Sequence, residues 1–328
     1  MIQEHLVWLN LYSEGWTKSR QQILNEISAA QLDPAYTNIV FRQREGVCME
    51  FFGALDFIRE WQTHTAWPDN QIFLRIHNPV EHYGAWINQT PEPKVWFLTQ
   101  AAQYAHNYFC HSAPQMFGFF VGRPTPERMR IMRDIQSLWP RQFVTSQLTD
   151  TEPSRVDLML WMIQNFTPDL FDRSELGDFL SWYEQYQPCS LDAMTIEDQT
   201  QLPHSRLCAS LAPVYSDFAV ELVAETMVRG NCFFPTEKTA RPMALGKPFV
   251  IFGPRDYLKN LRGFGFRTFG DLWDESYDQL EGRDRWLAMI PVIEHICSNP
   301  DLVQSSAEIV AHNHALISRP TVHFDWHI

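Results

Sequence analysis

The sequence has no apolar run long enough to cross a bilayer, and no basic N-terminal segment that leads into an apolar core. A membrane-spanning helix needs about 20 consecutive apolar residues, and the acidic residues Glu4 and Glu14 interrupt the N-terminal region. A secretory leader would need both of the missing features. We therefore expect a soluble, cytoplasmic protein that does not associate with a membrane.

Short motifs for metal binding and catalysis are also missing. The six cysteines among 328 residues are widely scattered and form no Cys-x-x-Cys, so neither a zinc site nor a redox pair is indicated. Free thiols in a reducing compartment are the default for such cysteines. The sequence contains no internal repeat, Walker loop, Gly-x-Gly-x-x-Gly or Gly-x-Ser-x-Gly. The usual signatures of P-loop, dinucleotide-binding and serine-hydrolase sites are therefore absent from it.

Basic residues are fewer than acidic residues. Lysine and arginine number 26 against 39 aspartates and glutamates, which gives a net charge of −13 and a pI of about 5.3. Such a protein is a poor general binder of DNA, RNA or anionic membranes. A local basic groove stays open as an alternative, because four arginines lie close together in the sequence, at positions 123, 128, 130 and 133.

Core-forming residues are plentiful. Apolar residues make up 45% of the chain and aromatic residues 14%, and the length suits two domains of ordinary size. Short apolar runs, typical of buried strands, alternate with segments of helical spacing, which predicts an α/β fold with parallel sheets. In the N-terminal part we expect a helix near 18–32, then strands at Ile39–Phe41, Ile72–Ile76 and Val95–Leu98, with a helix near 49–59 between the first two strands. Together they predict a small α/β domain over residues 1–113.

A second α/β domain is predicted over residues 114–328. Its first strand is Met116–Val121, and Thr125 with Pro126 gives a strong helix start, since threonine caps and proline favours the first helical position. Spacing predicts that Met129, Met132, Ile135 and Leu138 form the buried stripe of this helix. A further strand at Gln142–Thr145, helical segments within 155–187, and terminal helices at Arg283–Cys297 and Leu302–His314 complete the domain.

The most informative stretch runs from Ser216 to Asp278. Phe218–Val223 reads as a buried strand, Thr236 as the cap of a helix over Glu237–Leu245, Gly246 as the residue that ends it, and Pro248–Phe252 as the next strand. Tyr257, Leu258 and Leu261 give another helical face. Strand, polar loop, helix and strand in this order are typical of a parallel sheet.

Polar residues of this stretch fall where such sheets bind ligands, beyond the carboxyl ends of strands and beside helix N-termini. A lysine beside a helix N-terminus favours an anion, because free N–H groups, the helix dipole and the ammonium all attract negative charge. Lys238 occupies such a position, while the carboxylates of Glu225 and Glu237 suit sugar hydroxyls. This combination indicates a nucleotide or nucleotide sugar. Alternatively, Glu237 and Lys238 are a solvated pair on an ordinary helix.

The same residues carry a resemblance to a known family. Phe-x-Thr-Glu-Lys at 234–238, Gly-Lys-Pro-Phe-Val-Ile-Phe-Gly at 246–253 and the pattern from Leu258 to Asp278 resemble the donor-binding domain of α1,3-fucosyltransferase-like glycosyltransferases. The pattern from Leu258 onward looks like the branch that is common in phages and some bacteria. The resemblance covers about the C-terminal third of the chain. If a phage encodes the protein, its location would be the host cytoplasm.

The resemblance implies two facing Rossmann-like domains of the glycosyltransferase B type and an inverting transfer of a sugar from a nucleotide-sugar donor to a hydroxyl acceptor. Arg123 and Lys238 would neutralise the leaving diphosphate. Thr236 and Glu237 would complete the donor site, with Glu225 as a second carboxylate. No Asp-x-Asp occurs, so no metal site and no cofactor is implied besides the donor substrate.

The catalytic base and the acceptor stay open. The family resembled is expected to use a glutamate of the N-terminal domain as the base, yet Gln100 stands after the strand where it might be found, and an amide cannot act as a base. Glu50, Asp56 and Glu81 are the candidates instead. The acceptor could be a glycan, a protein or a modified DNA base, the last as in a phage DNA-base (hydroxymethylpyrimidine) glycosyltransferase. A non-catalytic sugar-binding protein of the same fold is the other alternative.

Overall fold

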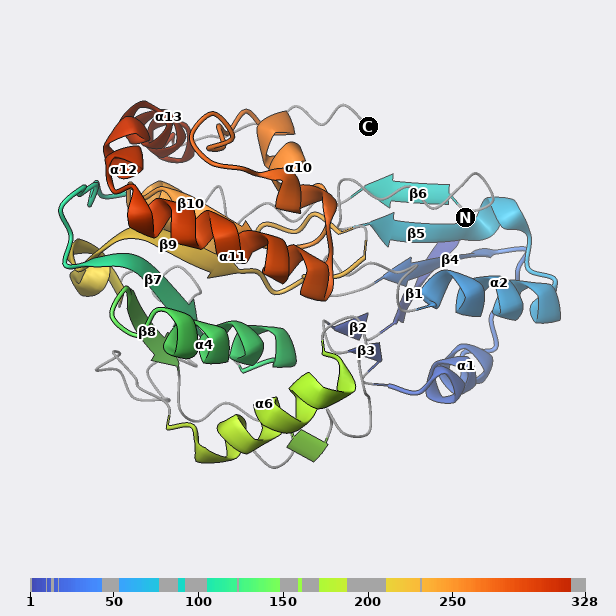
Figure 1. Cartoon of the computed structure of the whole chain (residues 1–328). Helices are drawn as coiled ribbons and strands as arrows, with labels where there is room; N and C mark the ends of the chain where they lie inside the picture. The colour runs from blue at the N-terminus through green and yellow to red at the C-terminus, as the bar shows by residue number, and fades with distance from the viewer. Residues whose placement is uncertain are drawn as a thin grey trace. The chain divides into compact units, whose positions relative to one another are not determined.

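The structure is a computed structural model of the chain (Figure 1). It describes residues 2–9, 11–12, 15–16, 18–42, 53–76, 88–91, 105–122, 124–147, 159–160, 171–187, 211–230 and 232–319. The chain has an α/β fold with two separate parallel sheets, as the sequence predicts. No helix in these described residues is long and apolar enough to cross a membrane.

The chain divides into two compact units. Unit 1 takes in the described residues of Met1–Val95 together with Thr226–Phe234, and unit 2 takes in those of Trp96–Glu225 and Pro235–Phe324. The domain boundary that the sequence suggested after residue 113 stays a prediction. Each unit contains one four-stranded sheet.

Unit 1 has a sheet whose strand order follows the chain. Its strands are parallel and lie in the order β1 (Gln3–Trp8), β4 (Thr37–Arg42), β5 (Ile72–Ile76) and β6 (Asn88–Pro91). The remaining elements are the two-stranded hairpin of β2 (Leu11–Tyr12) and β3 (Gly15–Trp16), the helices α1 (Arg20–Ala29) and α2 (Ala54–Thr65), and the 3-10 turn η1 (Asp69–Gln71).

Local sequence explains the helix starts and the core of unit 1. Ser19 and Gln22 form a reciprocal capping box at the start of α1, which satisfies two otherwise unpaired N–H groups. Ile23 and Ile27 then face the sheet and are buried. The predicted strands at 39–41 and 72–76 are confirmed, whereas β1 and β6 were not predicted. The strand predicted at Val95–Leu98 lies outside the described residues.

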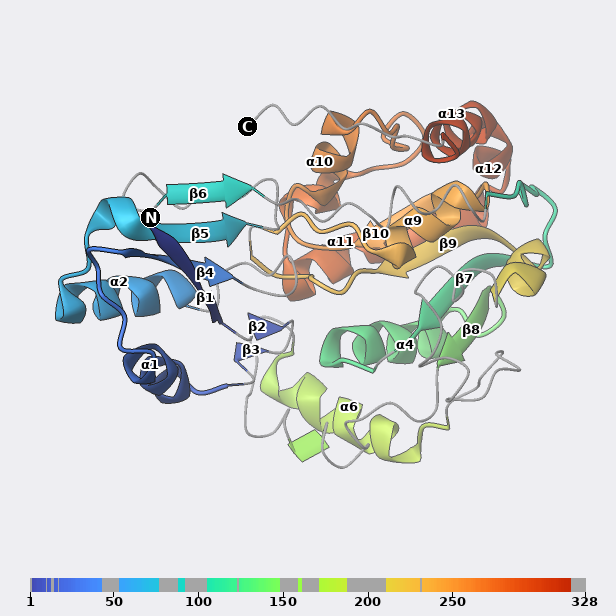
Figure 2. The ribbon, with the colours of Figure 1, turned by 180° about the vertical axis from the view of Figure 1, so that it is seen from behind.

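Unit 2 has a doubly wound sheet. Its parallel strands lie in the order β10 (Phe249–Phe252), β9 (Phe218–Ala224), β7 (Gln115–Val121) and β8 (Phe143–Gln147). Figure 1 shows α4 (Pro126–Leu138) and α11 (Gly282–Ser298) in front of this sheet, and Figure 2 shows α9 (Glu237–Ala244) on the opposite face. The other elements are α6 (Arg173–Gln185), α10 (Tyr257–Gly263), α12 (Asp301–Ser305), α13 (Ala307–Ile317), η3 (Ala212–Ser216) and η4 (Ser276–Gln279).

The strand order creates a topological switch point between β7 and β9. The chain leaves β7 to one side to form β8, and it later places β9 and β10 on the other side. Right-handed crossovers then put the connecting helices on opposite faces of the sheet. In open α/β sheets, ligands bind beyond the carboxyl ends of the strands at such a point. The topology therefore directs attention to the ends of β7 and β9.

Most predicted elements of unit 2 are confirmed, but the buried face of α4 was partly wrong. Met129, Met132 and Ile135 are buried, whereas Leu138 is 48% exposed at the last turn. Arg128 and Arg130 are buried instead. Within the helical region predicted at 155–187, the described residues contain α6, and the terminal helices appear as α11 to α13.

Candidate functional site

The end of β7 leads directly into the N-terminus of α4. The strand ends at Val121, and Thr125 caps the helix by accepting a hydrogen bond on its hydroxyl oxygen from the N–H of Arg128 at 3.4 Å. Pro126 occupies the first helical position, as predicted. The connecting residue Gly122 is open, since a Cβ atom built there would have no neighbour within 4 Å. Arg123, which the sequence predicts to bind the diphosphate, lies outside the described residues.

Arg128 links this helix to the end of β9. Its side chain is 4% exposed and donates a hydrogen bond from Nη2 to the carbonyl oxygen of Glu225 at 3.0 Å. Arg130 is 2% exposed and points to Glu175 on α6. These two arginines are therefore turned into the protein, and the basic groove considered from the sequence does not form from them.

Glu225 follows β9, and its carboxyl group accepts several hydrogen bonds from protein groups. Its carboxyl group accepts hydrogen bonds from the backbone N–H of Thr236 at 3.1 Å, from the Thr236 hydroxyl at 2.6 Å and from the Tyr257 hydroxyl at 3.0 Å. The hydroxyl of Thr239 donates a further bond. Only 1% of Glu225 is exposed. The geometry gives Glu225 a bracing role between β9, α9 and α10, while its predicted contact with a donor stays a prediction.

The N-terminus of α9 carries the polar residues that the sequence singled out. Thr236 is the cap, as predicted, and its hydroxyl oxygen accepts from the N–H of Lys238 at 3.3 Å. The Lys238 ammonium lies 2.5 Å from Glu237 Oε1 and 3.4 Å from the Thr236 hydroxyl. The side chains of Lys238 and Glu237 are 14% and 15% exposed. They are thus a half-buried ion pair at a helix N-terminus, not a solvated pair.

The other end of α9 is fixed by a glycine turn. Gly246 has φ of +68°, and the N–H groups of Gly246 and Lys247 bond back to the carbonyls of Met243 and Pro242, which is the Schellman arrangement. Lys247 is buried and donates to the carbonyl oxygen of Phe218 at 2.6 Å. Burial lowers the pKa of its ammonium to about 8.

A buried charged cluster beneath α9 was not predicted. Arg241 on α9 forms an ion pair with Glu221 on β9, and the hydroxyl of Tyr215 contacts both side chains. A glutamate within the apolar run Phe218–Ala224 was the sequence signal for this cluster, since a buried carboxyl needs a partner. The cluster holds α9 against the sheet and so orients the Thr236–Lys238 end of the helix.

The acidic residues near the end of the informative stretch are structural. Asp278 accepts hydrogen bonds from the N–H groups of Leu258 and Lys259 at 2.9 and 3.0 Å and caps α10. Arg285, fully buried, donates to the same carboxyl group at 3.0 Å. Glu275 likewise accepts from Thr268 and from the N–H of Phe269. This part of the family-like pattern therefore stabilises the fold around α10.

Of the residues considered for the catalytic base, Asp56 is described, and it is exposed in the first turn of α2 in unit 1. Glu50, Glu81 and Gln100 lie outside the described residues. Within the residues that the structure describes, no group of three or more His, Cys, Asp or Glu side chains is arranged to hold a metal ion.

Comparisons with known proteins give little. No protein-family model and no curated protein matches the chain. Among solved structures, the chain is similar to the α,α-trehalose 6-phosphate synthase from Burkholderia multivorans, with a TM-score of 0.37 and 11% sequence identity. The alignment covers 90% of this chain but 65% of the length of that synthase. A likeness of this degree carries no argument about activity, so the function proposed below rests on the residues of this chain.

Proposed function

We propose that the protein is an inverting glycosyltransferase that takes a sugar from a nucleotide-sugar donor. The observation that carries the proposal is the N-terminus of α9. Its half-buried Lys238–Glu237 pair lies next to Thr236, which two hydrogen bonds tie to the end of β9 beside the switch point. The resemblance of this segment to the fucosyltransferase-like donor site supports the same conclusion.

Each residue would have a distinct role toward the donor. The ammonium of Lys238 and the positive end of the α9 helix dipole would favour a diphosphate. Glu237 would accept hydrogen bonds from sugar or ribose hydroxyls. Arg123, which follows β7 in the sequence, would also neutralise part of the diphosphate charge. Glu225 and Arg128 would act by holding the two helix ends in place.

The chemistry would be a direct displacement. The acceptor hydroxyl oxygen attacks the anomeric carbon, the bond from this carbon to the diphosphate oxygen breaks, and the configuration inverts. The hydroxyl proton passes to a carboxylate base, for which Asp56, Glu50 and Glu81 are the candidates. Negative charge grows on the diphosphate as the bond breaks, so Lys238 and Arg123 would stabilise the transition state more than the ground state.

The arginines of α4 bear on the choice of acceptor. A DNA-base glycosyltransferase needs a basic groove for the phosphate backbone. Arg128 and Arg130 are buried and bonded to Glu225 and Glu175, and Arg133 pairs with Asp134 at 2.8 Å. A small-molecule, glycan or protein acceptor therefore fits this chain better than DNA.

A thermal-shift screen of the full chain against GDP, UDP, ADP, CMP and their common sugar conjugates tests the proposal. A ligand present at 100 times its dissociation constant stabilises the folded state by about 2.7 kcal/mol. We expect one nucleotide family to raise the melting temperature, and we expect EDTA to leave that shift unchanged. If no ligand stabilises the protein at millimolar concentration, the proposal is wrong. If a nucleotide sugar raises the melting temperature but the protein does not slowly hydrolyse it, the non-catalytic alternative is favoured instead.

A further inference from the structure

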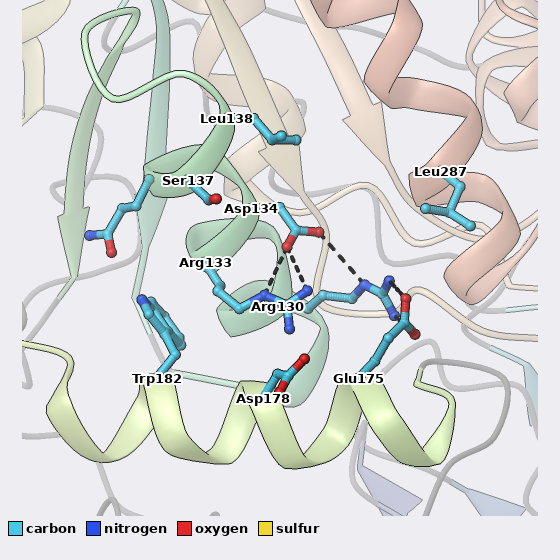
Figure 3. A pocket seen from close by; sticks show the side chains of 10 residues that line it. Arg130, Arg133, Asp134, Ser137, Leu138, Glu175, Asp178, Trp182 and Leu287 are labelled. Atoms are coloured by element: carbon cyan, nitrogen blue, oxygen red, sulfur yellow. Dashed lines mark hydrogen bonds and ion pairs between the residues drawn. The ribbon is translucent and has the colours of Figure 1, made fainter.

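A groove lies on unit 2 between α4 and α6, away from the switch point. Its volume is about 600 Å³, within the range of about 300–1,000 Å³ that small-molecule sites occupy. Figure 3 shows Asp178 and Trp182 on α6 across from Ser137 and Leu138 on α4, with Leu287 of α11 at one side. Its exposed polar residues on α4, Gln136 and Ser137, lie about 17–18 Å along the helix from the cap Thr125. Arg130, the lining residue of α4 nearest the cap, is turned to Glu175 at 3.1 Å. The groove and the switch point are therefore different sites.

Trp182 gives this groove a rigid aromatic wall. Its ring lies 4.8 Å from the ring of Tyr186 and 5.6 Å from that of Phe179, measured between centroids. These buried rings hold the indole in position, while Trp182 itself keeps part of its surface exposed. The face of an aromatic ring carries negative charge density and attracts polarised C–H groups. The C–H face of a sugar ring is such a group, and exposed Leu138 and Leu287 add apolar surface beside it.

The groove also offers hydrogen-bonding groups that the protein does not use itself. Gln136, Ser137 and Asp178 line it and are exposed. Within the described part of the chain, no hydrogen bond or ion pair engages these three side chains. An amide, a hydroxyl and a carboxyl group together supply both donors and acceptors. Such a mixture matches the hydroxyl groups of a sugar, each of which donates and accepts.

The charges of the groove argue against an anionic ligand. It is lined by the two arginines Arg130 and Arg133 and by the three acidic residues Asp134, Glu175 and Asp178. Arg133 is paired with Asp134 at 2.8 Å and Arg130 with Glu175 at 3.1 Å. Glu175 is also paired with Arg283 at 2.9 Å, and Arg283 in turn lies 3.7 Å from Asp172. With this pair included, three arginines face four carboxyl groups, so the cations are compensated and one carboxyl group is in excess. A phosphate or sulfate would meet net negative charge here, whereas a neutral ligand would not.

We propose that the groove between α4 and α6 is a second binding site, and that its ligand is a neutral saccharide. Such a site would hold a glycan by one of its sugar units while chemistry proceeds elsewhere. The inference does not depend on the proposed transferase activity, because a non-catalytic protein could use the groove in the same way.

Saturation-transfer NMR with the full chain tests the site directly. The probes are the neutral disaccharides maltose, cellobiose, lactose and chitobiose, each with and without saturating GDP and UDP. We expect at least one disaccharide to bind whether or not the nucleotides are present. Asp178→Ala should weaken that binding about tenfold or more, since it removes a hydrogen bond to a charged group. Gln136→Ala should weaken it about twofold to tenfold.

Gln185→Ala is the matched control, because Gln185 is an exposed glutamine on α6 that does not line the groove. All three substituted side chains are exposed, so these variants should fold normally, and a circular dichroism spectrum and a melting curve verify it. The proposal is overturned if none of the disaccharides binds at about 20 mM, a concentration high enough to reveal a complex with a dissociation constant in the millimolar range. It is also overturned if Asp178→Ala and Gln136→Ala bind as the control does.

Discussion

Arg128 on α4 donates a hydrogen bond to the carbonyl oxygen of Glu225 at 3.0 Å, and so the first turn of α4 is tied to the end of β9. The same residue, Glu225, braces the start of α9 through its side chain. The two helix N-termini beside the switch point are therefore positioned by one short segment of backbone. Changes at that segment should affect folding, whereas changes at the tip of α9 should affect ligand binding.

Glu225→Ala should destabilise the protein by about 3 kcal/mol or more. The substitution removes the buried acceptor of one backbone N–H and of the hydroxyl groups of Thr236, Thr239 and Tyr257. The hydroxyls of Thr239 and Tyr257, 2.9 Å apart, can still bond to each other, and each group left unpaired costs about 1–3 kcal/mol. Glu225→Gln should cost less, because one acceptor oxygen remains. Denaturant unfolding followed by tryptophan fluorescence measures both. If the alanine variant loses less than about 0.5 kcal/mol of unfolding free energy, the hydrogen bonds of Glu225 do not contribute to stability as proposed.

Lys238→Ala should weaken nucleotide binding about tenfold to a hundredfold. The loss of a charge-assisted hydrogen bond in a half-buried site is worth roughly 1.5–3 kcal/mol. Stability should fall by about 1 kcal/mol or less, since the Glu237 carboxyl loses its partner. Lys259→Ala is the control, because Lys259 is an exposed lysine that also pairs with a nearby acid. Calorimetric titration with the nucleotide found by thermal shift gives the affinities. If the two variants bind equally well, Lys238 is not part of the site.

Gly246→Ala should destabilise the protein by about 2 kcal/mol. At φ of +68° an alanine is strained by about 1–2 kcal/mol, and its Cβ would lie 2.5 Å from Oδ1 of Asn107. Gly122→Ala is the control, because a Cβ atom there meets open space. Adding Asn107→Ala should remove the contact with Oδ1, but not the strain or the 3.2 Å contact with the Asn107 Cα. Asn107→Ala alone measures the cost of losing the hydrogen bond that Oδ1 accepts from the N–H of Phe109. Melting temperatures of the single and double variants test this prediction. Equal values for Gly246→Ala and Gly122→Ala would show that position 246 does not require glycine.

Stability should fall in acid as Glu175 becomes protonated. Hydrogen bonds from the Arg283 guanidinium, together with those from the Asp172 N–H and Arg130, lower the pKa of Glu175 from 4.5 to about 2. Because the folded-state pKa is the lower one, the stabilisation is present above pH 4.5 and is lost as the pH falls toward 2. After allowance for solvent screening, it amounts to about 1–2 kcal/mol.

Glu175→Gln should remove this part of the acid dependence, so the variant and the wild type should differ in stability at neutral pH and converge near pH 2. Asp178→Asn removes an exposed carboxyl group from the same helix and is the control. Urea unfolding between pH 2 and 7 provides the comparison. A constant difference between Glu175→Gln and wild type over that range would contradict the assignment.

The sequence predicts those elements whose signals are local. The strand at Phe218–Ala224 is a continuous apolar run, and Thr236 and Gly246 mark the two ends of α9 through their capping chemistry. The strand β1 was missed because Val7 is the one fully buried residue within Gln3–Trp8, so its pattern is weak. Such an edge strand is defined by its pairing with β4, which residue spacing does not show.

Tertiary contacts of the candidate site could not be predicted in the same way. Glu225 and Tyr257 are 32 residues apart, and their hydrogen bond depends on how β9 and α10 pack. Periodicity alone also made Leu138 part of a buried stripe, although it is 48% exposed and lines the groove between α4 and α6. The arginines Arg128 and Arg130 looked like part of a basic surface for a similar reason. Their partners, the carbonyl oxygen of Glu225 and the carboxyl group of Glu175, are distant in sequence.

The division into compact units has a consequence for synthesis of the protein. Thr226–Phe234 belongs with the first unit, and it is flanked by Glu225 and Thr236, which bond to each other within the second. During translation, this segment leaves the ribosome more than a hundred positions after Val95, when the core residues of unit 1, from Val7 to Leu74, have already been made. No uninterrupted piece of the gene therefore encodes unit 1 without most of unit 2. Truncated forms that stop near residue 100 should therefore keep the core of unit 1 but lose its contacts with Thr226–Phe234.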